Sequence, residues 1–321
     1  MAVLLDIGRA VLGASVASLD IVGRVNQHIA DEPYYLPIAA DDPQAGGGWE
    51  YFTPTRSTAS VWTSTIQHGG PPAGLLTRAL RRAAGAGSGP NQATSEVAFS
   101  RITTDILGPV GFGTNRVRAS VIRPGRQISL LEAQLQTKQE DGDYRTAATA
   151  RAWQLHGESS SAIAHPPQPP MTPGPAELEI VRGVTPQTTA GVDWGTIGFI
   201  GSTETAWVDG RNGTTGAVWI RPLVPLVAGE ETDALDSLAI VADVANGVGT
   251  TLDPRQWTWM NTDTTIHLLR RPVGSWIAID SDLAIGPEGF GATLGDLYDE
   301  QGYVARTAQT VLISPPMFGR G

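Results

Sequence analysis

The sequence predicts an α+β protein in which two antiparallel sheets, each wrapped around one central helix, follow one another along a single chain. Three observations support this prediction. A proline-rich segment divides the chain, both sides show one helix followed by several strands, and short turns join those strands. Helices that cover one face of an antiparallel sheet are typical of the α+β class.

The dividing segment runs from His165 to Pro175 and holds six prolines in eleven residues. Proline cannot donate to a helix or a sheet ladder and favours an extended chain. We therefore predict a linker at 157–184 between units at 31–156 and 185–316. A chain of 321 residues is long enough for two domains. Residues 1–30 are predicted to be a leader segment, either docked as an extra helix or mobile.

In each unit, the spacing of apolar residues predicts one helix and then strands. The helices are expected at 70–84 in the first unit and at 235–246 in the second. The strands are expected at 114–123, 127–137 and 144–155 in the first unit, and at 262–271, 276–283 and 303–313 in the second. Alternation is clear in the last of these, where residues 307, 309, 311 and 313 share one face.

Both units also carry the same two turn signals. Arg123-Pro124 and Arg271-Pro272 follow the first of these strands, and acidic glycine turns at 140–144 and 299–303 precede the last. The interval between the two signals is longer in the second unit, which indicates divergence or an insertion. Duplicated units of this length favour an internally two-fold domain pair. A helix wrapped by a curved sheet is the hotdog arrangement, so the predicted fold is a double hotdog.

Composition excludes several classes of function. The chain has 22 Lys and Arg against 32 Asp and Glu, a formal net charge of −10, which argues against nucleic-acid and anionic-lipid partners. It has no cysteine, so disulfides, thiolate metal sites and a cysteine nucleophile are excluded. No apolar run is long enough for a membrane-spanning helix, and a cytoplasmic location is expected.

Common catalytic and cofactor motifs are also missing. The five histidines show no metal-ligand spacing, and neither a G-x-S-x-G nor a G-x-x-x-x-G-K-[ST] motif is present. The stretch 289–295 resembles a dinucleotide fingerprint only loosely, and we predict a turn or bulge there. We therefore expect no metal and no other cofactor.

The strongest local signal in the first unit is the stretch 67–74, Gln-His-Gly-Gly-Pro-Pro-Ala-Gly. Gly69 and Gly70 allow close approach of a ligand to the backbone, and Pro71 suits the first turn of a helix. Free N–H groups at a helix start can bind a carbonyl oxygen or a phosphate. The alternative is that His68 and Gly69 only cap the helix.

Three polar residues of the second unit are candidates for catalysis. Asp243 lies at the margin of the apolar stripe of helix 235–246, where it is either a general base or a structural carboxylate. Thr262 opens a strand and faces the same way as Thr264, so it either orients a water or packs. Gln309 interrupts an inward-facing apolar row and must satisfy its amide, which indicates a polar pocket nearby.

These residues resemble the acyl-CoA thioesterase II family, whose members are double hotdogs. The resemblance covers nearly the whole chain after residue 31. In the first unit it depends on His68–Leu76 and on the stretch 101–125. In the second unit it depends on Asp243, on Asn261-Thr-Asp with Arg271-Pro272, on Gly274-Ser-Trp, and on the stretch 299–309.

In that family an Asp, a Thr and a Gln of the second unit hold the attacking water. The resemblance carries these roles to Asp243, Thr262 and Gln309. Asp263-Thr264 departs from the family, which has an apolar residue followed by Asp there, so Asp243 and Asp263 both stay open as the base. His68, Gly69, Gly70 and Arg271 are the implied substrate-binding residues, with Arg271 a candidate for a CoA phosphate.

The resemblance therefore implies hydrolysis of an acyl-CoA thioester to a free acid and CoA. The oxyanion donor would be a backbone N–H at the helix start after Gly69 or at the one near Leu235. We expect the ligand to lie in the seam between the two units. The alternatives are a non-catalytic acyl-CoA-binding protein, or a hydratase or dehydratase on the same fold. Assembly into a homo-oligomer stays open.

Overall fold

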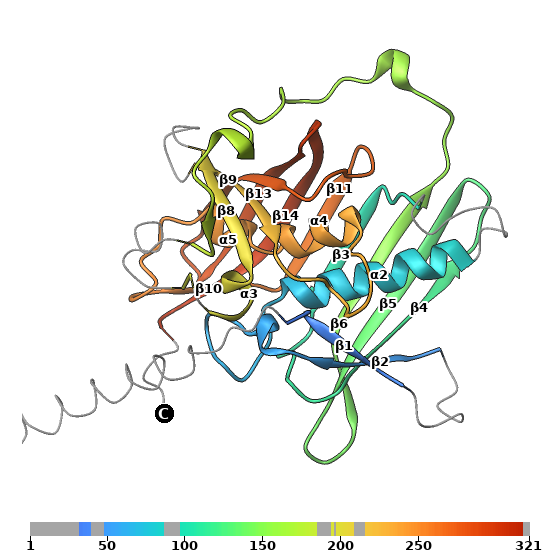
Figure 1. Cartoon of the computed structure of the whole chain (residues 1–321), viewed down its shortest axis with the longest axis vertical. Coiled ribbons are helices and arrows are strands. Elements are labelled where there is room, and N and C mark those ends of the chain that lie inside the picture. Colours follow the sequence, from blue (N-terminus) through green and yellow to red (C-terminus); the bar gives the residue numbers. More distant parts are fainter. Residues whose placement is uncertain are drawn as a thin grey trace, which may run out of the picture.

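The computed structural model describes residues 32–39, 48–86, 97–184, 194–195, 197–208 and 216–316. The predicted leader, 1–30, lies outside the described residues, as does 185–193 of the predicted second unit. The described residues form a mixed structure of strands and a few helices, as the α+β prediction requires (Figure 1).

The strands belong to one continuous antiparallel sheet. Their bounds are β1 Tyr35–Ile38, β2 Glu50–Pro54, β3 Arg101–Ile106, β4 Asn115–Arg123, β5 Ile128–Lys138, β6 Tyr144–Leu155, β7 Val181–Arg182, β8 Thr203–Val208, β9 Ala217–Pro222, β10 Thr258–Asn261, β11 Asp263–Leu268, β12 Ile277–Ile285, β13 Phe290–Asp299 and β14 Gly302–Ser314. The order across the sheet is β1-β2-β4-β5-β6-β3-β11-β14-β13-β12-β9-β8-β7, with β10 paired to β14. The two predicted sheets are therefore joined at the antiparallel pair β3–β11.

The topology repeats about this junction. Read outward from β3, the first half runs β3, β6, β5, β4, β2, β1, and outward from β11 the second half runs β11, β14, β13, β12, β9, β8. Apart from the two-residue β7 and from β10, which pairs with β14 beside the main order, each half therefore has two strands before its helix and four after it. This equivalence confirms the predicted internal repeat. The acidic glycine turns are also equivalent, because they join β5 to β6 and β13 to β14.

Two sequence predictions about the second half are wrong. The Arg-Pro turns are not equivalent, since Arg123-Pro124 follows β4 and Arg271-Pro272 follows β11, the counterpart of β3. The stretch 289–295 is not a turn throughout, because only Gly289 has a positive φ, of 78°, and β13 begins at Phe290. The missed strand accounts for the longer interval between the two signals.

One central helix of each half covers the same face of the sheet. These are α2, Gly70–Ala86, and α4, Ala234–Ala242, which pack against each other (Figure 1). The shorter helices are α3 Gly198–Gly201, α5 Ala245–Val248, and the 3-10 turns η1 Arg56–Thr58, η3 Ser161–Ile163 and η4 Pro175–Glu177. The predicted helix 235–246 is therefore broken: Asp243 caps the C-terminus of α4, and α5 follows two residues later.

Glycines allow the two central helices to approach closely. A Cβ atom at Gly70 would lie 2.7 Å from the Ile240 carbonyl oxygen, and one at Gly74 would lie 2.5 Å from the Ile240 side chain. Leu75, Leu76 and Leu80 of α2 are fully buried in a core that also takes in α4. The start of α2 is thereby fixed beside the end of α4.

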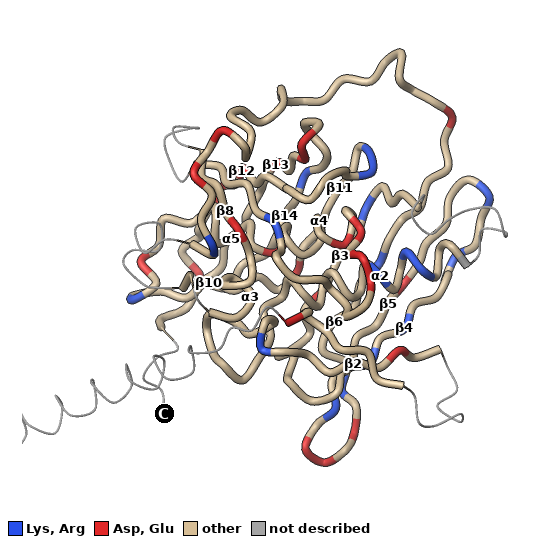
Figure 2. The backbone as a smooth tube through the Cα atoms, in the orientation of Figure 1, with Lys and Arg blue, Asp and Glu red and all other residues tan. Residues whose placement is uncertain are grey.

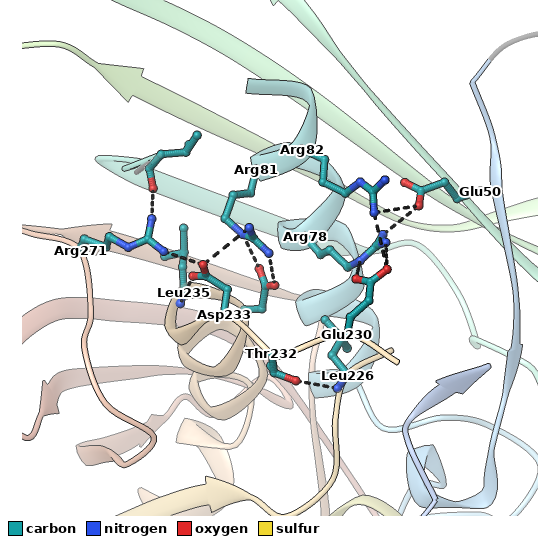
Figure 3. Close-up of polar contacts among 12 residues, drawn as sticks. Glu50, Arg78, Arg81, Arg82, Leu226, Glu230, Thr232, Asp233, Leu235 and Arg271 are labelled. Carbon is teal, nitrogen blue, oxygen red and sulfur yellow. Dashed lines mark hydrogen bonds and ion pairs between the residues drawn. The ribbon is translucent and has the colours of Figure 1, made fainter. Parts of the chain in front are cut away.

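Ion pairs surround this helix contact (Figure 3). Arg78 of α2 is buried and pairs with Glu230, and Arg81 of α2 pairs with Asp236 of α4. In Figure 2 the basic residues of α2 lie beside the acidic ones that lead into α4. Because Arg78 also pairs with Glu50, the first residue of β2, the network joins three segments that are distant in sequence.

The proline-rich segment leaves the sheet after β6 and crosses the outside of the molecule (Figure 1). Residues 155–170 are all exposed. The segment then meets the second half, where Met171 is buried in a small core and the Pro173 carbonyl accepts a hydrogen bond from Trp219 Nε1 at 3.0 Å. Only the first part of the predicted linker is thus free of the domain surface.

Candidate active site

The start of α2 is shaped by the His-Gly-Gly-Pro-Pro sequence. The His68 N–H donates to the Thr58 carbonyl at 2.8 Å, and the Gly69 carbonyl accepts the first helical hydrogen bond, from Ala73. Pro71 and Pro72 have no N–H to satisfy, which suits this first turn. The Gly70 N–H donates to His68 Nδ1 at 3.3 Å, the capping contact that the sequence offered as the alternative to ligand binding. The Gly69 N–H has no partner among the described residues.

Asp243 lies at the end of α4, directly against this helix start. The residue is 2% exposed. Its Oδ1 accepts a hydrogen bond from Asn261 Nδ2 at 2.7 Å, and its Oδ2 lies 2.9 Å from His68 Nδ1. Oδ2 accepts no hydrogen bond from the described residues.

Gly69 is required by this arrangement. A Cβ atom at that position would lie 2.6 Å from Asp243 Oδ1 and 2.8 Å from Oδ2. Only a residue without a side chain can bring the backbone of the first half so close to a carboxylate of the second. The site is therefore built across the contact between the two halves.

A bulge decides which residues of β10 and β11 face Asp243. Asn261 pairs with Val311 and Thr265 pairs with Ala308, so four steps along one strand match three along β14. An extra residue of this kind interrupts the two-residue alternation of a strand. Asn261 and Thr264 consequently lie together, with Asn261 Nδ2 3.2 Å from Thr264 Oγ1.

Gln309 and Thr264 form a layer behind Asp243. Gln309 Nε2 donates to the Asp243 carbonyl oxygen at 3.0 Å and to Thr264 Oγ1 at 2.9 Å. Both side chains are buried, and Gln309 Oε1 has no partner among the described residues. The amide therefore ties the last turn of α4 to β11 and β14, and acts on Asp243 through its backbone.

A cavity of about 580 Å³ opens in front of the carboxylate. Asp243, His68, Gly69, Asn261 and Thr262 line it near the helix contact. The rest of its wall is largely apolar and comes from both halves, including strands β8 and β9 and the chain after α4. This size is within the range of small-molecule sites in proteins.

The structure brings most of the predicted residues to one place. His68, Gly69 and Asp243 meet at the cavity, and Gln309 contacts Asp243 from behind. Their catalytic roles stay predictions. Asn261 and Thr264 were not predicted as site residues, because strict alternation places Asn261 on the face opposite Thr264. A bulge brings the two residues to the same face, and no residue in this stretch indicates that bulge.

Thr262 does not meet the other two predicted water-holding residues. It is exposed, and its hydroxyl lies 3.4 Å from the Thr310 carbonyl and 3.5 Å from Asp263 Oδ1. The bulge turns it away, and Thr264 occupies the place beside Gln309. Asp263 is also directed elsewhere, because its Oδ1 accepts the Thr310 N–H at 3.0 Å. Of the two candidate bases, only Asp243 lines the cavity.

Two predicted substrate-binding residues have structural partners instead. Gly70 does not line the cavity and is held against Ile240. The Arg271 guanidinium pairs with Asp233 at 2.5 Å and donates to the Val97 carbonyl at 2.8 Å (Figure 3). Arg271 also lies outside the described cavity wall, so the phosphate contact there stays a prediction.

The helix start near Leu235 is already satisfied. Asp233 accepts the Leu235 N–H at 2.9 Å, so this end of α4 offers no donor to a ligand through that group. Of the two predicted oxyanion sites, only the start of α2 lies at the cavity.

Within the described ranges, no three side chains are grouped as a metal site would require. In the same ranges, no helix is long and apolar enough to cross a membrane.

Comparison with protein families gives two matches that follow one another along the chain. Residues 58–155 match the acyl-CoA thioesterase N-terminal domain, and residues 164–313 match the acyl-CoA thioesterase C-terminal domain. The gap between the matches, 156–163, overlaps the start of the predicted linker. No curated protein matches the sequence significantly.

Solved structures share the fold at low sequence identity. An acyl-CoA thioesterase II, TesB2, from Mycobacterium marinum aligns with a TM-score of 0.55 at 14% identity, over 85% of this chain and 94% of its own. A hotdog-fold protein from Alicyclobacillus acidocaldarius aligns with a TM-score of 0.59 at 15% identity, over 85% and 95%. A Thermobifida fusca YX protein assigned as a thioesterase II gives 0.59 at 19%, over 84% and 93%. The predicted double hotdog is confirmed.

Proposed function

Because the chain belongs to the acyl-CoA thioesterase family, we propose that it hydrolyses an acyl-CoA thioester to a free acid and CoA, with Asp243 as the general base. The observation that supports this role is the buried Oδ2 of Asp243, which accepts no hydrogen bond from the described residues at the wall of a cavity. A carboxylate oxygen that is buried without a donor is costly, so a ligand that donates to it is expected there.

The attacking water would donate to Asp243 and lose its proton as it adds to the thioester carbonyl. Asn261 holds the other carboxylate oxygen and so fixes the direction of Oδ2. Thr264 and Gln309 are positioning residues in this proposal, because they hold Asn261 and the end of α4 rather than line the cavity. Thr262 has no role in it.

The Gly69 N–H is the proposed donor to the developing oxyanion. It has no partner among the described residues, it lies at the start of a 17-residue helix, and Gly69 lines the cavity. Such a donor is typically worth about 3 kcal/mol of transition-state stabilisation. The positive end of the helix adds to the effect. The thiolate of CoA then leaves as the carbonyl reforms, and it needs no strong acid to do so.

His68 is the proposed proton carrier beside Asp243. Its Nδ1 faces the carboxylate, and its ring lies against Phe199 with centroids 4.6 Å apart. A histidine in that position can take the proton that Asp243 removes from water and pass it to the departing thiolate.

The His68–Asp243 pair also supports a second candidate function. An acid–base pair of this kind could add water to the double bond of an enoyl-CoA. The two functions give different products, because hydrolysis releases a thiol and hydration does not.

The test is an assay of the purified protein with saturated and α,β-unsaturated acyl-CoA esters. We expect thiol release from the saturated esters and the loss of that release in Asp243→Asn. Loss of the enoyl absorbance without any thiol would favour the hydratase instead. If the protein binds the esters but catalyses neither reaction, the result would support the alternative of a non-catalytic acyl-CoA-binding protein.

A further inference from the structure

The cavity extends into the second half, and the lengths of the central helices explain why. Helix α2 has 17 residues and packs on β4, β5 and β6, whereas α4 has nine and ends at Ala242. Less of the second sheet is therefore covered by helix. The cavity takes in Thr203, Thr205 and Trp207 of β8 and Val218 and Ile220 of β9, besides residues at the contact between halves. A ligand therefore has room inside the second half. The sequence predicted only a site in the seam between the two halves.

The described wall of this cavity carries no Lys, Arg or Glu, and Asp243 is its one carboxylate. Apart from the reacting end, the bound group should thus be uncharged. Burial of apolar surface contributes roughly 25 cal/mol per Å² and would supply most of its affinity. The phosphates of CoA must lie outside the part of the cavity that these residues form.

Three tryptophans from distant parts of the chain form one side of the wall. Trp62 meets Trp259 edge to face with centroids 5.0 Å apart at 87°, and it meets Trp194 at 5.4 Å and 72°. All three line the cavity, and Trp62 and Trp194 are only half-buried. In an edge-to-face contact one indole presents only its edge, so that contact leaves the faces of this ring for a ligand.

This aromatic wall lies close to the proposed reacting atoms. Trp259 precedes Asn261 by two residues on β10, and Asn261 donates to Asp243. Residues two apart on a strand share a face and are about 7 Å apart. A group that touches Trp259 must therefore be attached near the thioester carbonyl, not at the end of a long chain.

We propose that the preferred acyl group carries a ring next to its thioester carbonyl, as an arylacetyl group does. The inference depends on the proposed thioesterase function. A ring packed against the three indoles gains edge-to-face or offset contacts in addition to its buried area. A straight alkyl chain with the same number of carbons gains only the free energy of burying its apolar area.

The test compares phenylacetyl-CoA with octanoyl-CoA, whose acyl groups have equal numbers of carbons. We expect kcat/KM to be roughly threefold to tenfold higher for phenylacetyl-CoA, the factor that one or two aromatic contacts give. Trp62→Leu should bring the ratio close to one. Trp257→Leu is the matched control, because Trp257 is 41% exposed and lies outside the cavity wall, and it should leave the ratio unchanged.

A second measurement separates the two proposals. The dissociation constants of both esters for Asp243→Asn, measured by calorimetry, report the preference without turnover. Tighter binding of phenylacetyl-CoA supports the ring even if the wild-type protein hydrolyses neither ester, which would remove the thioesterase function alone. Equal or tighter binding of octanoyl-CoA would overturn the inference, and hydrolysis of octanoyl-CoA would still support the function. Trp194→Leu replaces Trp62→Leu if the latter does not fold.

Discussion

Asp243 joins the two halves through a single carboxylate. Its Oδ1 is held by β10 and its Oδ2 faces the histidine before α2, so its position depends on elements from both ends of the sequence. Burial of a charge is tolerated only where donors surround it. One oxygen of this carboxylate, Oδ1, is held by a donor, whereas Oδ2 has no hydrogen-bond partner among the described residues. A reactive carboxylate needs both a fixed position and an oxygen that is left for the substrate.

Replacing Asp243 by Asn keeps the shape and removes the base. We expect kcat for acyl-CoA hydrolysis to fall by roughly 10²–10⁴ while the ester still binds. Asp263→Asn is the matched control, because Asp263 contacts the Thr310 N–H and lies outside the cavity wall. A larger loss of kcat in Asp263→Asn than in Asp243→Asn would show that the base is misassigned.

Substitutions of two threonines distinguish the geometry found here from the one that the resemblance implies. In this structure Thr264 contacts Gln309, whereas the resemblance gives that place to Thr262. Thr264→Val removes a hydroxyl oxygen that accepts from Asn261 and from Gln309. Each buried donor left without a partner costs about 1–3 kcal/mol, so we expect a lower melting temperature and a lower kcat. Thr262→Val changes an exposed hydroxyl and should change neither. Thermal denaturation and steady-state kinetics of both variants decide the matter, and the reverse result would restore Thr262 to the site.

At the scale of elements, the contact between α2 and α4 places the site. Gly70→Ala puts a methyl group 2.7 Å from the Ile240 carbonyl oxygen, which is backbone and cannot move aside alone. The helices must separate, and we expect a lower free energy of unfolding together with a lower kcat. Gly157→Ala is the control, since a Cβ atom there meets nothing within 4 Å. Equal unfolding curves for the two variants, measured in urea, would contradict the proposed tightness of this contact.

Elements that depend on local signals could be predicted from the sequence, and those that depend on pairing could not. The start of α2 and strands β4, β5, β6 and β14 follow from alternation and proline, and their predicted bounds differ by at most two residues. Strand β13 was missed because its glycines, Gly291 and Gly295, resemble a turn. In the sheet these glycines face crowded neighbours, with a Cβ atom at Gly291 only 2.4 Å from the Ala284 carbonyl.

The candidate site shows the same limit. Asp243 and Gln309 were identified by residue type and by resemblance, and they do lie together. Thr262 was identified by resemblance and by strict alternation with Thr264, and the bulge between β10 and β11 interrupts that alternation. Such a bulge depends on the register of β14, a strand more than 40 residues away in the sequence, so no local pattern could show it.

At the scale of the whole molecule, the two halves share both a sheet and a set of ion pairs. Asp236 of α4 illustrates the electrostatics of that shared region. Burial raises its pKa from 3.8 to about 6, even though Arg81 of α2 donates to it. Between these two pH values the unfolded chain releases the proton first, so the free energy of unfolding falls as the pH rises.

This carboxyl therefore stabilises the fold fully below about pH 4 and loses that contribution as the pH rises through about 6. The loss is on the order of 3 kcal/mol. Asp236→Asn cannot ionise, so the wild-type protein should lose stability relative to it over this range in urea unfolding. Asp253→Asn is the control with the opposite sign, because Arg255 lowers the pKa of that carboxyl. Parallel curves for wild type and Asp236→Asn would show that Asp236 does not change its pKa on folding.

The halves are held together by more than the chain that connects them. The pair β3–β11 joins their sheets by backbone hydrogen bonds, and the glycine-lined contact of α2 with α4 lies across the same junction. The connection, in contrast, is exposed from residue 155 to residue 170. The linker should therefore affect the rate at which the two halves associate. It should have little effect on the stability of the associated pair.

A specific protease site inserted after Ser160 tests this directly. Once cut, the two fragments should elute together at the mass of the intact protein, and hydrolysis of acyl-CoA should persist, because His68 and Gly69 from one fragment still meet Asp243 from the other. The uncut insertion variant is the control for the inserted residues. If the fragments separate on size exclusion under native conditions, the shared sheet and the helix contact are too weak to hold the halves, and the site would depend on the linker after all.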